Sequence, residues 1–176
     1  SPFALTSHPG QHYTNTTTLV NLAGTAPISA RTITINGVAY PLSWTSITNW
    51  AITLPLTGRT NQFLIEGRDA QGNLLNGASR TVTVYYNGPV AQPEDSLVIS
   101  EIMYQPAVTN AGYVEIFNRS TNTTFSLYNY RLRGVDFDFG PEHFLGPRSN
   151  LVVVKDLTTF RSVYGANVPV AGVFDG

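Results

Sequence analysis

Carboxylates and a histidine gather in one short segment of this chain. Asp136 and Asp138 are two residues apart, and Glu142 and His143 follow shortly after. Side chains two positions apart in a strand lie on the same face, so both aspartates would point the same way. Their oxygens could bind Ca²⁺, or the group could act as an acid–base pair. The alternative, which we favour, is that the phenylalanines alternating with the aspartates point into a core and the carboxylates point to solvent.

Two further polar sets are interpreted as loops. His8 and His12 have helical spacing for a metal site, but a proline and a glycine between them break any helix, so we expect a mobile loop. The segment Asp69–Asn73 offers oxygen ligands but lacks the acidic density and the closing glutamate of an EF-hand loop. We expect a turn stabilised by the aspartate and by Gly72.

Glu101 and Glu115 lie in apolar segments, where an unpaired buried carboxylate is costly. We expect them to face solvent or to pair with Arg131 or Arg133. The sequence contains no nucleophile elbow, phosphate-binding glycine loop or metalloprotease helix motif. No catalytic or cofactor-binding residue is therefore assigned, and Asp136 and Asp138 are the only metal candidates, for Ca²⁺.

Composition restricts the compartment and the partners. The 176 residues include no cysteine, which excludes disulfides and thiolate metal sites. Charged residues make up only 12%, and the net charge of −1 gives no reason to expect nucleic acid as a partner. No apolar run has membrane-spanning length. Thr, Asn, Ser and Gly dominate the polar positions, as is common in extracellular β-proteins, so we expect an extracellular or cell-surface location.

The chain divides into two all-β modules. Residues 1–88 show short strand patterns separated by turn signals, typical of a β-sandwich, with Asn36-Gly37 as a hairpin turn between 30–35 and 38–42. Trp44 and Trp50 are predicted core residues. Residues 89–95 contain two prolines and are predicted to form an extended linker. In residues 96–176, strands are predicted at 97–104, 113–118 and 151–155. Asp156 and Gly165 would cap a helix whose buried side carries Phe160, Val163 and Tyr164; it is the only helix expected in the chain.

The second module resembles a known family in the order of its segments. The matching pieces are Val98–Tyr104, Tyr113–Asn118, Leu127–Leu132, Phe137, Phe139, Gly146-Pro147, Leu151–Val154, Phe160 and Tyr164-Gly165. Over residues 96–176 this order is similar to the lamin tail domain family, an immunoglobulin-like β-sandwich. Residues 1–88 resemble, more loosely, the immunoglobulin-like repeats of bacterial surface proteins. The fold class implied is two tandem immunoglobulin-like sandwiches.

Members of the lamin tail family continue with further strands beyond the position of Gly176. The chain also begins with Ser1 rather than methionine. We therefore expect a fragment of a longer protein, with a second sandwich that is incomplete at its C-terminal end and has an exposed edge.

The resemblance implies a non-catalytic role, because bacterial lamin tail domains accompany secreted enzymes as accessory modules. We expect a structural or adhesive module pair of an exported bacterial protein, which acts as a spacer or contacts protein or glycan. One alternative is a subunit of a filament or surface layer, completed by a strand from a neighbouring chain. Another is a carbohydrate-binding accessory region with exposed aromatics, for which the candidates are Tyr85, Tyr86, Tyr104, Tyr128 and Tyr130.

Overall fold

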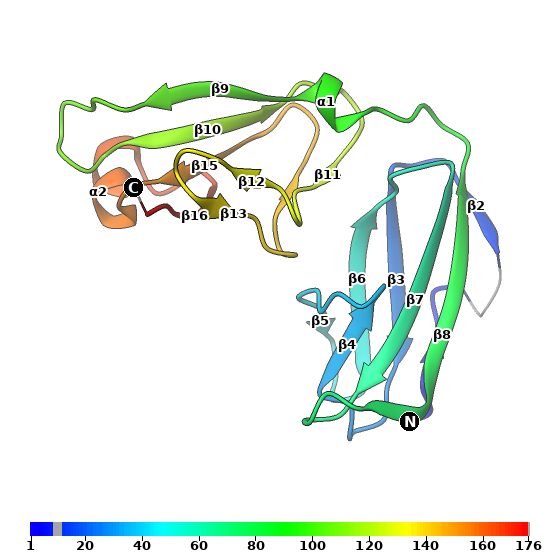
Figure 1. The fold of residues 1–176 in the computed structure, drawn as a ribbon. Coiled ribbons are helices and arrows are strands. Elements are labelled where there is room, and N and C mark those ends of the chain that lie inside the picture. The colour runs from blue at the N-terminus through cyan, green and yellow to red at the C-terminus, as the bar shows by residue number, and fades with distance from the viewer. Residues whose placement is uncertain (9–11, 176) are drawn as a thin grey trace. The chain divides into compact units, whose positions relative to one another are not determined.

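The computed structural model describes residues 1–8 and 12–175, and it divides the chain into two compact units (Figure 1). Unit 1 is Ser1–Val90 and unit 2 is Ala91–Gly176. The division falls inside the predicted linker. Strands make up 45% of the chain and helices 7%, so the units are of the all-β class, as expected for immunoglobulin-like sandwiches. Neither helix in the described part of the chain has the length and apolar composition needed to cross a bilayer.

Unit 1 is a sandwich of two four-stranded sheets. The first sheet has the order β1 (Ala4–Leu5), β3 (Leu19–Thr25), β6 (Asn49–Pro55) and β5 (Ser43–Trp44). The second has the order β2 (Tyr13–Asn15), β8 (Leu74–Tyr86), β7 (Thr60–Arg68) and β4 (Thr32–Ile35). Buried and more exposed residues alternate along β3 and β7, because each strand turns one face to the core. Leu22, Trp50, Ile65 and Val84 are among the residues buried between the sheets.

The Asn36-Gly37 turn forms as predicted, but the hairpin does not. Both residues have positive φ, 52° and 80°, and the turn closes with an isolated bridge between Ile35 and Val38. The chain then leaves the sheet, and β4 pairs with β7 instead. The Asn36 side chain donates to the carbonyl of Gln62 (2.9 Å) and accepts from the N–H of Leu64 (2.8 Å). The side-chain amide thus extends the β4–β7 ladder by one position, while the other edge of β4 has only the Ile35–Val38 bridge.

The two tryptophans have different environments. Trp50 is buried, with 1% of its surface exposed, and a Cβ added at Gly24 would clash with its ring. Trp44 is 42% exposed, so its assignment to the core is wrong. It lies opposite Trp50 in the ladder, but β5 is the edge strand of its sheet, where one side of the indole has no neighbouring strand to cover it.

The predicted linker is not extended throughout. Pro93–Ser96 forms a short helix, α1, with proline in its first turn, where the missing N–H is harmless. Glu94 and Asp95 in the same turn favour the positive end of the helix dipole. The helix is held by Arg119, whose backbone N–H donates to Ser96 and whose guanidinium donates to the carbonyl of Asp95. The sequence did not predict α1, because a helix of four residues is too short to show a periodic pattern of apolar residues.

Unit 2 has one four-stranded sheet, in the order β16 (Val170–Val173), β15 (Asn150–Val154), β10 (Tyr113–Asn118) and β9 (Leu97–Met103). Two short ladders accompany it: β11 (Phe125–Ser126) with β14 (Phe144–Leu145), and β12 (Arg131–Leu132) with β13 (Phe137–Asp138). Helix α2 spans Leu157–Tyr164. The three longer predicted strands and the predicted helix are therefore confirmed, within one residue at their ends.

Strand β15 is buried on both faces and separates two apolar clusters. Leu151 and Val153 belong to the cluster with Ile116, Leu127, Phe139 and Leu145. Val152 and Val154 belong to the cluster with Phe160 of α2. A strand covered on both sides is expected to be a continuous apolar run, and the sequence Leu-Val-Val-Val is one.

The caps of α2 confirm the sequence prediction. The Asp156 carboxylate accepts from the N–H of Thr159 at 2.7 Å, and Gly165 follows the helix with a φ of 93°. Hydrogen bonds from the side chain and the backbone of Thr159 lower the pKa of Asp156. Phe160 is buried as predicted, whereas Val163 is 41% exposed, so its place on the buried side is wrong.

A buried asparagine joins β10 to the short ladders. Asn118 is fully buried, and its Nδ2 donates to the carbonyls of Thr123 (2.8 Å), Leu145 (3.0 Å) and Gly146 (2.9 Å). Its Oδ1 accepts from the N–H of Ser120 at 2.9 Å. One side chain thus donates to buried backbone carbonyls in both the segment after β10 and the segment around β14.

Candidate functional site

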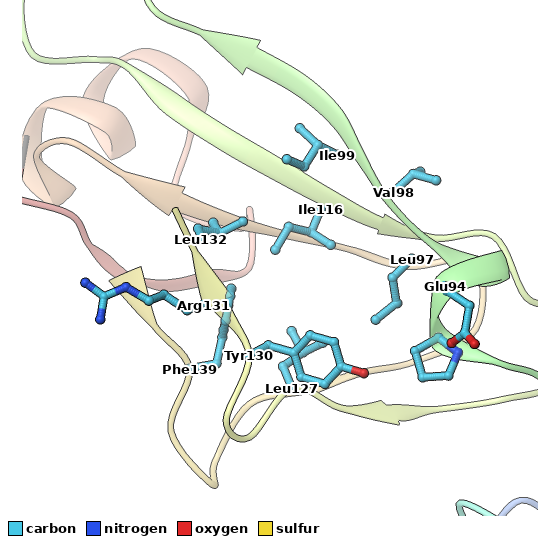
Figure 2. Close-up of a pocket in the computed structure, with 11 residues that line it drawn as sticks. Glu94, Leu97, Val98, Ile99, Ile116, Leu127, Tyr130, Arg131, Leu132 and Phe139 are labelled. Atoms are coloured by element: carbon cyan, nitrogen blue, oxygen red, sulfur yellow. The ribbon is translucent and has the colours of Figure 1, made fainter. Parts of the chain in front are cut away.

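Unit 2 has an apolar groove of about 300 Å³ beside the start of β9 (Figure 2). Aliphatic and aromatic side chains from β9, β10, the loop before β12 and the β12–β13 ladder line most of it. The lining residues are Pro93, Glu94, Leu97, Val98, Ile99, Ile116, Leu127, Tyr130, Arg131, Leu132 and Phe139. Glu94 and Arg131 are its two charged residues, and they lie at opposite ends of the view in Figure 2. The groove can therefore hold apolar side chains between two charges.

The groove exists because β9 is an edge strand with an uncovered face. In the register with β10, Ile102 lies opposite Val114 and Ile99 opposite Ile116, although Ile99 and Ile102 are three residues apart. A β-bulge at Ser100 absorbs the extra residue and keeps both isoleucines on the core face of the sheet. That face is buried at Val114 and Ile116, but Ile99 is 54% exposed and Ile102 is 58% exposed. The opposite layer of unit 2 therefore does not reach across β9.

A second hollow, of about 340 Å³, lies at the other end of the same strand. Ile102, Tyr104, Lys155 and Phe174 are among its lining residues. The Lys155 ammonium lies 5.8 Å from the centre of the Phe174 ring, a cation–π distance. Strand β9 thus has an apolar hollow at each end of its exposed core face.

The aspartate pair is engaged by an arginine. The Arg131 guanidinium donates to Asp136 at 2.9 Å and to Asp138 at 3.2 Å, and all three side chains are largely exposed. The hydrogen bond with Asp136, supported by the charges of both aspartates, raises the pKa of Arg131. Asp136 has a φ of 49°, in the left-handed region, within the turn that joins β12 to β13. The exposure of both aspartates agrees with the favoured interpretation that they face solvent. Ca²⁺ binding at these carboxylates remains the untested alternative, and any cation would compete with Arg131.

His143 is held by the backbone rather than by carboxylates. Its Nδ1 accepts from the N–H of Gly140 at 2.9 Å, and its Nε2 lies 3.0 Å from the carbonyl of Ala171. These partners specify the neutral tautomer with its proton on Nε2. Glu142 lies 3.7 Å from Nδ1, but that nitrogen already accepts a backbone proton, so the contact is not an ion pair. Across residues 1–8 and 12–175, no three His, Asp or Glu side chains cluster as a metal site.

The remaining polar candidates, the two N-terminal histidines and the Asp69–Asn73 segment, have local partners of their own. The His8 ring stacks on Tyr13, with centroids 3.6 Å apart, while His12 lies 6.2 Å from Tyr85. The loop predicted between the two histidines includes residues 9–11, which lie outside the described residues. Asp69 accepts from the N–H groups of Gln71 and Asn73, both at 2.9 Å, which confirms a structural turn.

The two strand glutamates do not pair with the arginines named above. Glu115 accepts from the Ser100 hydroxyl at 2.7 Å and from the Asn150 amide at 2.8 Å. Glu101 is exposed, which agrees with the solvent-facing alternative. Both glutamates lie on the sheet face opposite to Ile99 and Ile102, so they do not contribute to the groove.

The predicted aromatic candidates are divided between the two units and differ in their exposure. Tyr86 is buried in unit 1 and donates to the carbonyl of Pro89. Tyr85 is 43% exposed, also in unit 1. In unit 2, Tyr104 and Tyr130 are 80% and 44% exposed but line different hollows, and Tyr128 is half-buried. The groove itself was missed by sequence reasoning; its signal was the strand Leu-Val-Ile-Ser-Glu-Ile-Met, in which two isoleucines at odd spacing indicate a bulge.

Comparison with known proteins gives one family. The family model described as Lamin Tail Domain matches residues 90–174. No curated protein matches the chain. One similar solved structure is that of Bacteroides ovatus SGBP-B, from a mixed-linkage glucan utilization locus, in complex with a mixed-linkage heptasaccharide. The two chains share 13% identity with a TM-score of 0.30, and the alignment covers 94% of this chain but only 46% of that protein's length.

Proposed function

Because the second unit of this chain is a lamin tail domain, we propose that the chain is a non-catalytic pair of modules from a larger exported or cell-surface protein. The pair acts as a spacer and as a contact site for protein or glycan. The chemistry of the described side chains supports this role. Asp136 and Asp138 are bound by Arg131, His143 by backbone groups, and Glu115 by neutral side chains.

The observation that carries the proposal is the uncovered core face of β9. Its exposed isoleucines each line one of the two hollows at its ends, beside an unpaired strand edge. Exposed apolar surface of this kind marks a contact site in soluble proteins. An extended segment of another polypeptide could pair with the edge of β9 and place alternate side chains in the hollows.

A second candidate function uses the same strand. In a filament or surface layer, the segment that pairs with β9 would come from a neighbouring copy of the protein, and assembly would then depend on concentration. The carbohydrate-binding alternative does not require the β9 edge. Glycan binding should therefore be unaffected by substitutions on β9.

The test combines sedimentation velocity over a wide range of concentrations with amide hydrogen exchange of β9. The double variant Ile99→Lys/Ile102→Lys places charges on the exposed face, where the substitutions cost little stability because both side chains are already exposed. Val163→Lys, at a 41% exposed position on α2, is the matched control.

Each outcome separates the candidates. A monomer with fast-exchanging β9 amides at every concentration supports the spacer role. Assembly that protects β9 and is lost only in the double isoleucine variant supports the subunit role. Assembly that persists in that variant would contradict a contact through β9.

A further inference from the structure

Unit 1 has a hollow of its own, of about 460 Å³, between the loop before β4 and the segment around β5. Its lining residues are Ile28, Ala30, Arg31, Trp44, Ser46 and Ile47. They combine one aromatic ring, two large aliphatic side chains, one cation and one hydroxyl. Because the hollow belongs to the other unit, it is independent of the β9 groove and of the function proposed for that groove.

The apolar part of the hollow is unusually open. Trp44 is 42% exposed, and Ile28 and Ile47 are 65% and 77% exposed. Trp44 sits on the edge strand β5, so the part of its indole that is not packed faces the hollow. An exposed indole between two exposed isoleucines offers a flat apolar platform that the fold itself does not use.

The polar part has unused hydrogen-bonding groups. The Ser46 hydroxyl oxygen accepts from the N–H groups of Thr48 (3.2 Å) and Asn49 (3.0 Å), which fixes the oxygen and leaves its proton to donate. Within the described residues, the Arg31 guanidinium has no ion pair or hydrogen bond, whereas the nearby Arg68 is paired with Glu66 at 2.8 Å. The hollow therefore presents an uncompensated positive charge and a positioned donor beside the indole.

We propose that this hollow binds an acidic sugar residue, a hexuronate unit of a glycan. The apolar C–H face of the sugar ring would stack on the exposed indole of Trp44. Its carboxylate would accept two parallel hydrogen bonds from Arg31, a geometry suited to guanidinium. A ring hydroxyl would accept from Ser46. Charge complementarity selects an acidic over a neutral sugar.

Size favours a sugar over an acidic protein segment. A hollow lined by six residues matches the few hundred Å³ typical of small-ligand pockets. A specific protein interface buries about 800 Å² on each partner, which is far more than these six residues can offer. A short acidic peptide, unlike a folded protein, has a size that suits the hollow. It is therefore the competing ligand that the experiment has to exclude.

The experiment is a titration of the whole chain with trigalacturonate, followed by NMR. The chain has only two tryptophans, so it gives two indole N–H signals. The signal of exposed Trp44 should shift on binding, and that of buried Trp50 should not. Arg31→Gln, followed through the Trp44 signal, and Trp44→Ala, followed through the NMR signals of the ligand, should each weaken binding about tenfold. That is the effect expected for loss of a charged bidentate contact or of the apolar platform. Neutral trigalactose should bind correspondingly less well.

The matched control is Tyr85→Ala, which removes an aromatic side chain of the same unit that is equally exposed, at 43%. It should leave trigalacturonate binding unchanged. Three results would overturn the proposal: no shift of the Trp44 signal, equal loss of binding in Tyr85→Ala and Trp44→Ala, or binding of triglutamate as tight as that of trigalacturonate. The Arg31→Gln variant decides the matter if Trp44→Ala perturbs the fold.

Discussion

Glu101 and Glu115 lie directly opposite each other on neighbouring strands β9 and β10. Like charges at opposed positions destabilise a sheet unless other groups compensate them. The Glu115 carboxylate is compensated by Ser100 and Asn150, and Tyr113 on the same strand face forms a hydrogen bond with Glu101. Both opposed glutamates therefore accept hydrogen bonds from neutral groups. The charge of Glu101 also contributes to the raised pKa of Tyr113.

Tyr113 should make unit 2 sensitive to alkaline pH. Burial, followed by the hydrogen bond and charge of Glu101, raises the pKa of Tyr113 to about 12, from an ordinary value of 10.0. The neutral phenol therefore stabilises the folded state fully below pH 10.0, and this stabilisation is lost as the pH rises to about 12. We expect Tyr113→Phe to flatten the pH dependence of denaturant unfolding in this window. Tyr104→Phe, at an 80% exposed position, is the control, and an equal effect of both variants would contradict the assignment.

Asp69 should make unit 1 sensitive to acid. Its pKa is lowered from 3.8, chiefly by the backbone hydrogen bond from Asn73. The ionised carboxylate therefore stabilises the folded state above pH 3.8, and this stabilisation is lost as the pH falls through the lower folded-state pKa. Tryptophan fluorescence reports unit 1 alone, because Trp44 and Trp50 both lie there. We expect Asp69→Asn to show a shallower decline of the unfolding midpoint in acid; a decline as steep as that of the wild type would exclude Asp69 as its source.

Replacement of Asn118 should destabilise unit 2 strongly. Asn118→Ala leaves three buried or half-buried carbonyls without their donor, which we expect to cost about 2–3 kcal/mol in the free energy of unfolding. Thr121→Ala, at an exposed position of the same loop, should cost almost nothing. Chemical denaturation followed by circular dichroism measures both. Similar values for the two variants would show that the asparagine bonds are dispensable.

Calcium binding at the aspartate pair is tested most sharply through Arg131. Its guanidinium occupies both carboxylates, so Arg131→Gln should strengthen any Ca²⁺ binding by roughly fivefold. Asp136→Asn/Asp138→Asn should abolish that binding. Isothermal titration calorimetry distinguishes the cases, and a Ca²⁺ affinity unchanged in the double aspartate variant would exclude these residues as ligands.

Sequence patterns predicted the parts of the fold that rest on local rules. The strands around Val114 and Val152 and the helix capped by Asp156 follow from apolar periodicity and capping chemistry, and all three formed where expected. The lamin tail resemblance was also confirmed over residues 90–174. Short strands of two residues, such as β12 and β13, have no period to detect.

The site features that were missed depend on tertiary placement. The exposure of Trp44 and Ile99 follows from their position on edge strands, which no residue pattern specifies. The pairing of Arg131 with Asp136 depends on a positive φ within a tight turn. Both kinds of feature become visible only once the strand order is known.

The burial of Asn118 has a consequence for protein maturation. Asn118-Arg119-Ser120 is an acceptor sequence for N-linked glycosylation, and the sugar would be attached to the Nδ2 atom. That atom has no solvent exposure and contacts three backbone carbonyls, so the folded domain has no space for a glycan there. A glycan added before folding would keep the loop after β10 from closing. Expression in a secretory pathway that modifies this sequence would therefore yield either an unmodified Asn118 or a misfolded second unit.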